Sequence, residues 1–249
     1  DRSDIFIFMG DNVYGDDRIT GKLNKLSKAY KKQKTKIPLA KLEETNEVYA
    51  IWDDHDYGKN DGGADYQYKK EAKNLFLDFW NISLNDPRRD REGIYFETKK
   101  ITKKGILQII FLDTRYFRSP LKRTDERGAP GKERYLPDND PNKTILGNKQ
   151  WEWLSNKLDE NADIRIIASS IQIIAEGHGF EKWGNLPREK KKLYDLIDTK
   201  KIKDIIFLSG DRHAGGIYKE KTTKGTMLYE ITSSSLNLPG AAWVTKYKG

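Results

Sequence analysis

Seven short apolar runs recur along the chain, and they constrain its fold more than any other feature. They are rich in β-branched and aromatic residues, which is typical of buried strands. The runs are Ile5 to Met9, Val48 to Trp52, Ile94 to Glu97, Ile106 to Leu112, Ile164 to Ile174, Ile205 to Leu208 and Met227 to Ile231. Helical patterns lie between several of them, so the sequence predicts an α/β fold.

Three helices are predicted from apolar periodicity and from one proline. The first places apolar side chains on one face at positions i, i+3, i+4, i+7 and i+8, namely Ala72, Leu75, Phe76, Phe79 and Trp80. A second carries Trp151, Leu154 and Leu158 at helical spacing. A third begins at Pro187, since proline is tolerated in the first turn of a helix.

Two further segments have clear signatures. The runs Ile94 to Glu97 and Ile106 to Leu112 are predicted to form a β-hairpin whose longer loop is the lysine-rich "TKKITKKG". Arg123 to Asn142 is predicted to be one long irregular loop, and loops of that length tend to be functional or mobile. No internal repeat or linker is evident, so we expect a single domain over residues 1–249.

Composition excludes several classes of protein. The formal net charge of +8 attracts anions in general, but lysine runs such as "KKQKTK" lack the alternating aromatic residues that stack bases, so no specific nucleic-acid recognition is expected. The absence of cysteine excludes disulfides, thiolate zinc sites and a cysteine nucleophile. No segment reaches the roughly 20 apolar residues of a membrane span, and the sequence shows no signal peptide.

Carboxylates and histidines follow three of the predicted strands directly. The segments are "MGDNVY" (Met9 to Tyr14), "IWDDHDYGKND" (Ile51 to Asp61) and "FLSGDRHAGG" (Phe207 to Gly216), and they hold two of the three histidines in the chain. Four ionisable side chains in succession, as in "WDDHD", repel one another unless a cation or an arginine lies between them. Such ligands collected from separate strand ends predict a two-metal site, of the kind that catalyses phosphoryl transfer.

These segments resemble the metallophosphoesterases, and within them the alkaline phosphatase D (PhoD-like) family. The resemblance rests on "GDNVYGD", "WDDHDYGKND", "FLDTRYFR", "LGNKQWEWL", "SSIQII" followed by "EKWGNLP", and "LSGDRHAGG", in that order, and it covers nearly the whole chain. It implies that Asp11 bridges two metal ions and that Tyr14 binds a ferric ion. A phenol with a pKa of about 10 ionises as a ligand only beside a strongly Lewis-acidic ion.

The resemblance assigns further roles to the other segments. Asp211 and His213 look like the family's Gly-His-x-His ending with its first histidine replaced by aspartate, which favours calcium or another oxygen-loving ion. Asp54 and Asn60 are the two candidates for the metal ligand in "WDDHDYGKND". His55 would then act at the leaving group, as a general acid or a hydrogen-bond donor. The expected cofactors are two or more metal ions, Fe³⁺ and Ca²⁺, with other divalent ions as alternatives.

Two more residues have alternative interpretations. The guanidinium of Arg115 suits bidentate binding of phosphate, but an ion pair with Asp113 is an equally good interpretation. His178 lies on a glycine-flanked loop that could overhang the site and contact substrate, although a structural role is the more common one for a lone histidine.

The family's fold is a sandwich of two mixed β-sheets flanked by helices, and we expect it here. The family has a first strand upstream of "IFIFMGD", ending in a Cys or Asp that also binds the iron, so this chain is expected to lack that strand. Family resemblance also implies export to the periplasm, the cell surface or the medium. Oligomeric state is not indicated by any motif.

The expected activity is hydrolysis of phosphate esters, with a small-molecule or phospholipid-type substrate. Water or hydroxide on the metals would attack phosphorus, so no serine or cysteine nucleophile is required, and the sequence has no Gly-x-Ser-x-Gly motif. The residues do not separate monoesterase from diesterase activity. The alternative is a catalytically impaired metal- or anion-binding module of the same fold, and a nucleic-acid binder is a weaker one.

Overall fold

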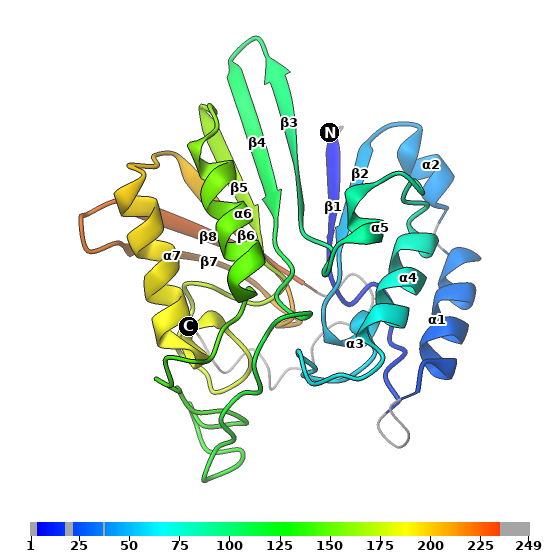
Figure 1. Cartoon of the computed structure of the whole chain (residues 1–249), viewed down its shortest axis with the longest axis horizontal. Helices are drawn as coiled ribbons and strands as arrows, with labels where there is room; N and C mark the ends of the chain where they lie inside the picture. The colour runs from blue at the N-terminus through cyan, green and yellow to red at the C-terminus, as the bar shows by residue number, and fades with distance from the viewer. Residues whose placement is uncertain (1–3, 18–21, 37, 235–249) are drawn as a thin grey trace.

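A six-stranded mixed sheet organises the computed structural model, which describes residues 4–17, 22–36 and 38–234 (Figure 1). Its strands are β3 (Phe96–Thr102), β4 (Gly105–Phe111), β5 (Ile164–Ala168), β6 (Ile205–Ser209), β7 (Gly215–Lys221) and β8 (Met227–Ser233). They follow the order β3-β4-β5-β6-β8-β7. The four inner strands are mutually parallel, and β3 and β7 are antiparallel to their neighbours at the two edges.

A smaller sheet packs against the large one. Within the described residues it contains β1 (Ile5–Met9) and β2 (Glu47–Ile51), which pair in parallel along their whole length. The helices are α1 (Asn24–Lys34), α2 (Leu39–Glu43), α3 (Asp54–Tyr57), α4 (Lys69–Phe79), α5 (Pro87–Asp90), α6 (Gly147–Asp159), α7 (Pro187–Thr199) and the 3₁₀ turn η1 (Trp183–Asn185). Figure 1 shows α6 and α7 beside the large sheet, and α1 and α4 beyond the small one. This arrangement confirms the predicted α/β sandwich flanked by helices.

Each face of the large sheet has its own apolar core, because successive side chains of a strand point to opposite faces. On one face, Ile110 of β4 and Phe207 of β6 pack with Trp151 of α6. On the other face, Ile109 and Phe111 of β4 pack with residues of β1, β2 and α4. The near-continuous apolar runs of the sequence therefore arise from strands that are covered on both sides.

One predicted strand is shorter than expected. The run from Ile164 to Ile174 leaves the sheet after Ala168, where the Ser169 hydroxyl donates to the carbonyl of Ile171 (2.7 Å) and turns the chain. Ile171 and Ile173 are buried in the helix-side core as loop residues. A buried loop next to a strand has the same apolar signature as the strand itself, so the prediction was wrong beyond Ala168.

The predicted hairpin is confirmed, but its loop is shorter than predicted. Strand β3 continues through the lysine-rich segment as far as Thr102, which pairs with Gly105. Lys99 forms an ion pair with Glu160 (2.6 Å), so the lysines of this segment belong to the edge strand and do not end it. The edge strand β7 was not predicted, because alternate residues along it are exposed and it begins with two glycines.

The long loop between β4 and α6 is irregular, as predicted. Within Arg123 to Asn142 the described structure has one isolated β-bridge, between Arg123 and Tyr135. Across residues 4–17, 22–36 and 38–234, no helix has the length and apolar character needed to span a bilayer.

Candidate functional site

The carboxyl ends of five strands, from both sheets, meet at one edge of the sandwich. Asp11 follows β1, Asp54 follows β2, Arg115 follows β4, Ser170 follows β5 and Asp211 follows β6. Ligands bind outside the carboxyl ends of strands in open α/β sheets, because loops from neighbouring strands converge there. The three segments picked out in the sequence are therefore brought together by the fold.

Close packing and unusual backbone angles shape the first of these loops. Gly10 has φ +102°, and a Cβ atom there would lie 2.5 Å from the Cβ of Asp53. Asp11, Asp211 and His213 adopt positive φ values of 52°, 63° and 52°. Positive φ is uncommon for non-glycine residues, and Asp61 in the loop after β2 adopts it as well, with φ 52°.

Asp56 holds the first two loops together as a structural brace. Its carboxylate accepts hydrogen bonds from the backbone N–H of Asp53 (2.5 Å) and from the side chain of Asn12 (2.5 Å). The Tyr30 hydroxyl donates to its backbone carbonyl (3.0 Å). Burial raises the pKa of Asp56 to about 8, although these hydrogen bonds act to lower it. The side chain is shielded from solvent, so its role is to hold the two loops in place.

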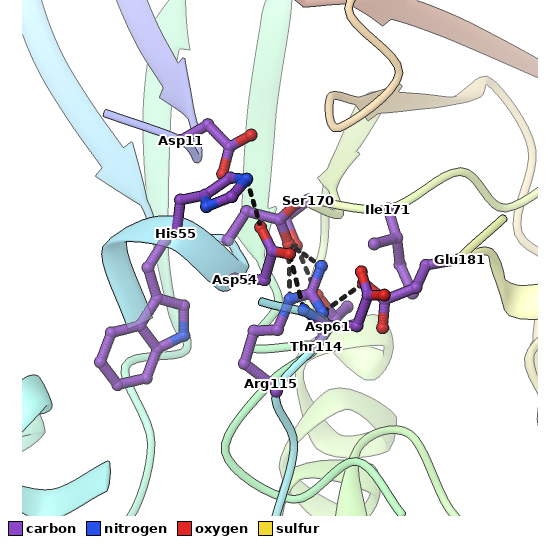
Figure 2. Close-up of polar contacts among 12 residues, drawn as sticks. Asp11, Asp54, His55, Asp61, Thr114, Arg115, Ser170, Ile171 and Glu181 are labelled. Carbon is purple, nitrogen blue, oxygen red and sulfur yellow. Dashed lines mark hydrogen bonds and ion pairs between the residues drawn. The ribbon is translucent and has the colours of Figure 1, made fainter. Parts of the chain in front are cut away.

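Three groups of acidic or imidazole side chains have ligand atoms within 4.8 Å of one another. They are Asp11, Asp54 and His55; Asp53, Asp54 and Asp211; and Asp54, Asp61 and Glu181. Asp54 belongs to all three groups, and Figure 2 shows it between Asp11 and His55 on one side and Arg115 and Glu181 on the other. The carboxylate of Asp54 is therefore the common member of every potential metal-binding group in the described chain.

Several oxygens of this cluster are buried without a hydrogen-bond donor. Among the described residues, Asp11 Oδ1, Asp53 Oδ2 and Asp54 Oδ1 have no such partner. Burial, reinforced by the charges of Asp54 and Asp53, raises the pKa of Asp11 well above its usual range. Burial also raises the pKa of Asp53 and of Asp211 to about 7, despite the nearby arginines. Unpaired, mutually repelling carboxylates are what a cation would neutralise, so the donor set fits metal ions.

Tyr14 and His213 lie beside Asp11, as the resemblance implied. The Tyr14 hydroxyl donates to Asp11 Oδ2 (3.1 Å) and lies 3.4 Å from Nε2 of His213. The same Nε2 is 4.0 Å from Asp11 Oδ2. A phenol, a carboxylate and an imidazole thus converge from two strand ends, a set suited to a hard or borderline metal ion.

His55 is oriented by a residue that the sequence reading missed. Its Nδ1 is 2.6 Å from Asp16 Oδ1, and its Nε2 is 3.9 Å from Asp54 Oδ1. Burial opposes a charge on this ring, but the hydrogen bond to Asp16 and the charge of Asp54 outweigh it and raise the pKa of His55 to about 9. The ring lies against that of Tyr14, with centroids 4.3 Å apart and the planes tilted by 36°. The predicted Asn60 lies in the turn after α3 and is half-buried.

Arg115 is fully buried and binds carboxylates that the sequence did not suggest. Its Nε donates to Asp53 Oδ1 (2.6 Å), and its Nη1 donates to Glu181 Oε2 (2.5 Å). The suggested ion pair with Asp113 is wrong, because Asp113 accepts the backbone N–H of Arg115 (2.9 Å) and the indole N–H of Trp52 (2.9 Å). Arg115 therefore positions two members of the acidic groups, and its direct contact with phosphate stays a prediction.

Asp61 links the site to the long loop. Its Oδ2 accepts from Nη1 of Arg134 (2.7 Å) and from the hydroxyl of Tyr135 (2.8 Å). Its backbone N–H donates to Asp54 Oδ2 (2.7 Å), which fixes the central carboxylate. Asp53 and Asp61 stand in the segment "WDDHDYGKND". Glu181 opens "EKWGNLP", which carries part of the family resemblance, but no role was assigned to it.

His178 does not overhang an open cleft. It is buried, with Nε2 at 2.9 Å from Gln172 Oε1, and its Nδ1 accepts the backbone N–H of Phe180 (3.2 Å). Both ring nitrogens are therefore used within the protein, which favours the structural role over substrate contact.

Comparison with known proteins places this arrangement in a family. The sequence profile described as PhoD-like phosphatase matches residues 1–247. The chain belongs to the PhoD-like phosphatase family. A relative, alkaline phosphatase D of Bacillus subtilis (strain 168), is 28% identical over 143 aligned positions, and the match covers 52% of this chain and 24% of that protein. This chain therefore spans about a quarter of that relative's length.

The fold agrees with a solved structure from the PhoD-like family. The structure described as "Structure of PhoD" superposes with a TM-score of 0.68 at 16% identity, covering 94% of this chain and 52% of that one. At this identity the likeness bears on the fold alone. Both the family membership and the clustered carboxylates indicate that this site can hold metal ions.

Proposed function

We propose that this chain hydrolyses phosphate esters with the help of two or more metal ions held at the joint edge of its two sheets. The observation that carries the proposal is the set of buried carboxylate oxygens on Asp11, Asp53 and Asp54 that have no donor among the described residues. Membership of the PhoD-like phosphatase family supports the same reaction class.

Two sets of residues would hold the ions. Tyr14 and His213 with Asp11 form one set, and Asp54 with Asp211 forms the core of the other, to which Asn60 is the further predicted ligand. Asp11 is the predicted member of both sets. Fe³⁺ suits the set with the phenol and Ca²⁺ suits the carboxylates. When bound, such ions would supply Lewis-acid activation of water and stabilisation of charge on the phosphoryl group.

The surrounding residues position the carboxylates of both sets, and one of them can donate a proton. Arg115 holds Asp53 and Glu181, so the carboxylates are fixed before a substrate arrives. His55 is held by Asp16, and this hydrogen bond favours the protonated ring, so His55 can donate to the departing oxygen of an ester. The acidic group of Asp11, Asp54 and His55 gives His55 a second candidate role, as a metal ligand.

Hydrolysis of a chromogenic phosphodiester and a chromogenic phosphomonoester tests the proposal. The chain, purified without chelator and analysed for metals, should hydrolyse at least one of the two, lose activity with a chelator, and regain it when the ions are restored. Asp54→Asn should lower metal content and rate together. A metal-loaded, folded chain that hydrolyses neither ester would instead be the binding module of the same fold.

A further inference from the structure

One arginine beside the acidic groups has no carboxylate partner in the described part of the chain. Arg212 lies between Asp211 and His213, and its backbone N–H donates to the carbonyl of Gly210 (2.7 Å). Its guanidinium lies over the ring of Phe180, with Cζ 4.3 Å from the ring centroid. An aromatic face attracts a guanidinium but uses none of its five N–H donors in a conventional hydrogen bond. Within the described residues no hydrogen bond or ion pair uses these donors, so they can bind an anion from outside.

The backbone of this loop separates Arg212 from its neighbours. Asp211 and His213 both have positive φ values, and each joins the site: Asp211 groups with Asp53 and Asp54, and His213 approaches Tyr14. The side chain between them goes to Phe180 instead. A guanidinium is thus held next to the acidic groups; its charge acts on Asp211, but it forms no ion pair with a carboxylate among the described residues.

Phe180 is fixed by the contact between two long loops. The carbonyl of Gly179 accepts the backbone N–H groups of Arg134 (3.0 Å) and Tyr135 (2.8 Å), and the N–H of Phe180 donates to His178 Nδ1 (3.2 Å). The guanidinium of Arg134 also lies near the Phe180 ring, at 5.7 Å, but it is paired with Asp61. The segment that carries the Phe180 ring is therefore held against the long loop by backbone hydrogen bonds.

We propose that Arg212, supported by Phe180, binds non-bridging oxygens of the substrate's phosphoryl group. The proposal rests on the proposed function and names a substrate-binding residue for it. A planar guanidinium binds two phosphate oxygens at once, and holding it in advance reduces the entropy lost on binding. Arg115 is suited to this task by sequence, but it is buried and engaged by Asp53 and Glu181. Arg212 is half-buried, and its guanidinium donates no hydrogen bond to any described residue.

Binding of inorganic phosphate to the metal-loaded chain, measured by calorimetry, tests the proposal separately from turnover. Arg212→Met keeps an aliphatic side chain against Phe180 and should weaken phosphate binding about 10- to 100-fold, the range for hydrogen bonds to a charged group. Arg212→Lys keeps the charge but lacks the planar pair of donors of a guanidinium, so its affinity for phosphate should lie between those of the wild type and Arg212→Met. KM for a phosphate ester should rise in the same order while metal content stays at the wild-type level.

The exposed Arg127, in the long loop, provides the matched control, and Arg127→Met should bind phosphate as the wild type does. Unchanged phosphate binding and KM in Arg212→Met would show that the Phe180 contact is only structural and would overturn the proposal. Failure of the wild-type chain to bind phosphate would overturn it as well. Phosphate binding that depends on Arg212, in a chain without esterase activity, would support this assignment and refute the proposed function.

Discussion

At the scale of single residues, the buried carboxylate of Asp11 is expected to lower the stability of the metal-free protein. It is surrounded by Asp53 and Asp54, and burial with their charges opposes its ionisation. Asp11→Asn should therefore stabilise the metal-free protein, because the amide replaces a carboxylate whose ionisation burial and neighbouring charges oppose. The same change should lower metal content and activity. Thermal unfolding with chelator, together with elemental analysis, measures both effects; a variant that keeps its metals and turnover would argue against the predicted bridge.

His55 and His213 are predicted to do different work. His213→Ala should lose metal and slow every substrate, because this ring lies with Tyr14 and Asp11. His55→Ala should keep its metal and lose about 10²- to 10⁴-fold in rate on esters with poor leaving groups, the usual range for general acid catalysis. Nitrophenyl esters should be affected much less, since nitrophenolate leaves without a proton.

A series of leaving groups separates these roles. Equal losses on all esters, with metal lost from both variants, would reassign His55 as a metal ligand of the group it forms with Asp11 and Asp54.

His178, which belongs to none of the acidic groups, is expected to make the free energy of unfolding depend on pH. Burial, with the nearby charges of Arg212 and Lys182, lowers the pKa of His178 to about 2, whereas an unfolded histidine has a pKa near 6.5. The unfolded chain therefore binds more protons below pH 6.5, and this histidine's contribution to stability is lost as the pH falls.

The difference between wild type and His178→Gln isolates this contribution. Between about pH 6 and pH 4.5, the wild type should lose stability faster than the variant by up to about 1.4 kcal/mol per pH unit. Denaturant unfolding over that range provides the measurement, and taking the difference cancels the opposite trend of carboxylates with raised pKa values, such as Glu181. If the free energies of unfolding of the two proteins changed with pH in parallel, His178 would have the same pKa in the folded and the unfolded chain, which would contradict the prediction.

At the scale of elements, the junction of two long loops depends on one glycine. A Cβ atom on Gly179 would lie 2.5 Å from the backbone N of Glu133 and 2.7 Å from the Cα of Lys132. Gly179→Ala should therefore force the loops apart, cost about 1–3 kcal/mol, and make Arg123 to Asn142 more sensitive to limited proteolysis.

Gly215 in β7 is the matched control for this change. Its Cβ would meet only the carbonyl of Thr232 among the described atoms, at an ordinary 3.8 Å. Gly215→Ala should leave both stability and proteolysis nearly unchanged. Equal effects of the two substitutions would mean that the loop junction is not tightly packed.

At the scale of the whole molecule, strand β4 belongs to two cores at once. Ile109 packs towards the small sheet and Ile110 packs towards α6 and α7, and both are buried. Ile109→Ala and Ile110→Ala should each destabilise the protein by about 2–5 kcal/mol and leave a single unfolding transition, because one strand couples both cores. Calorimetry checks this, and two separate transitions would contradict the expected single domain.

The local signals of the sequence were enough for seven of the eight described strands and for most of the site's residues. Buried strands, amphipathic helices and the acidic residues after strand ends are each recognised within about ten residues, because side-chain periodicity and turn chemistry act at short range. Asp11, Asp54, Asp211 and His213 do lie together as predicted. Errors arose where short-range patterns are ambiguous, as in the buried loop after Ala168.

Only the tertiary structure decided which charges meet. Arg115 lies two positions from Asp113 in sequence, yet its side chain reaches Glu181, 66 positions away, because β4 and the loop after β5 are neighbours at the sheet edge. Phe180 meets Arg212 for the same reason, since strand order brings their loops together. Strand order and register join residues that are far apart along the chain, and no local pattern in one sequence encodes that joining.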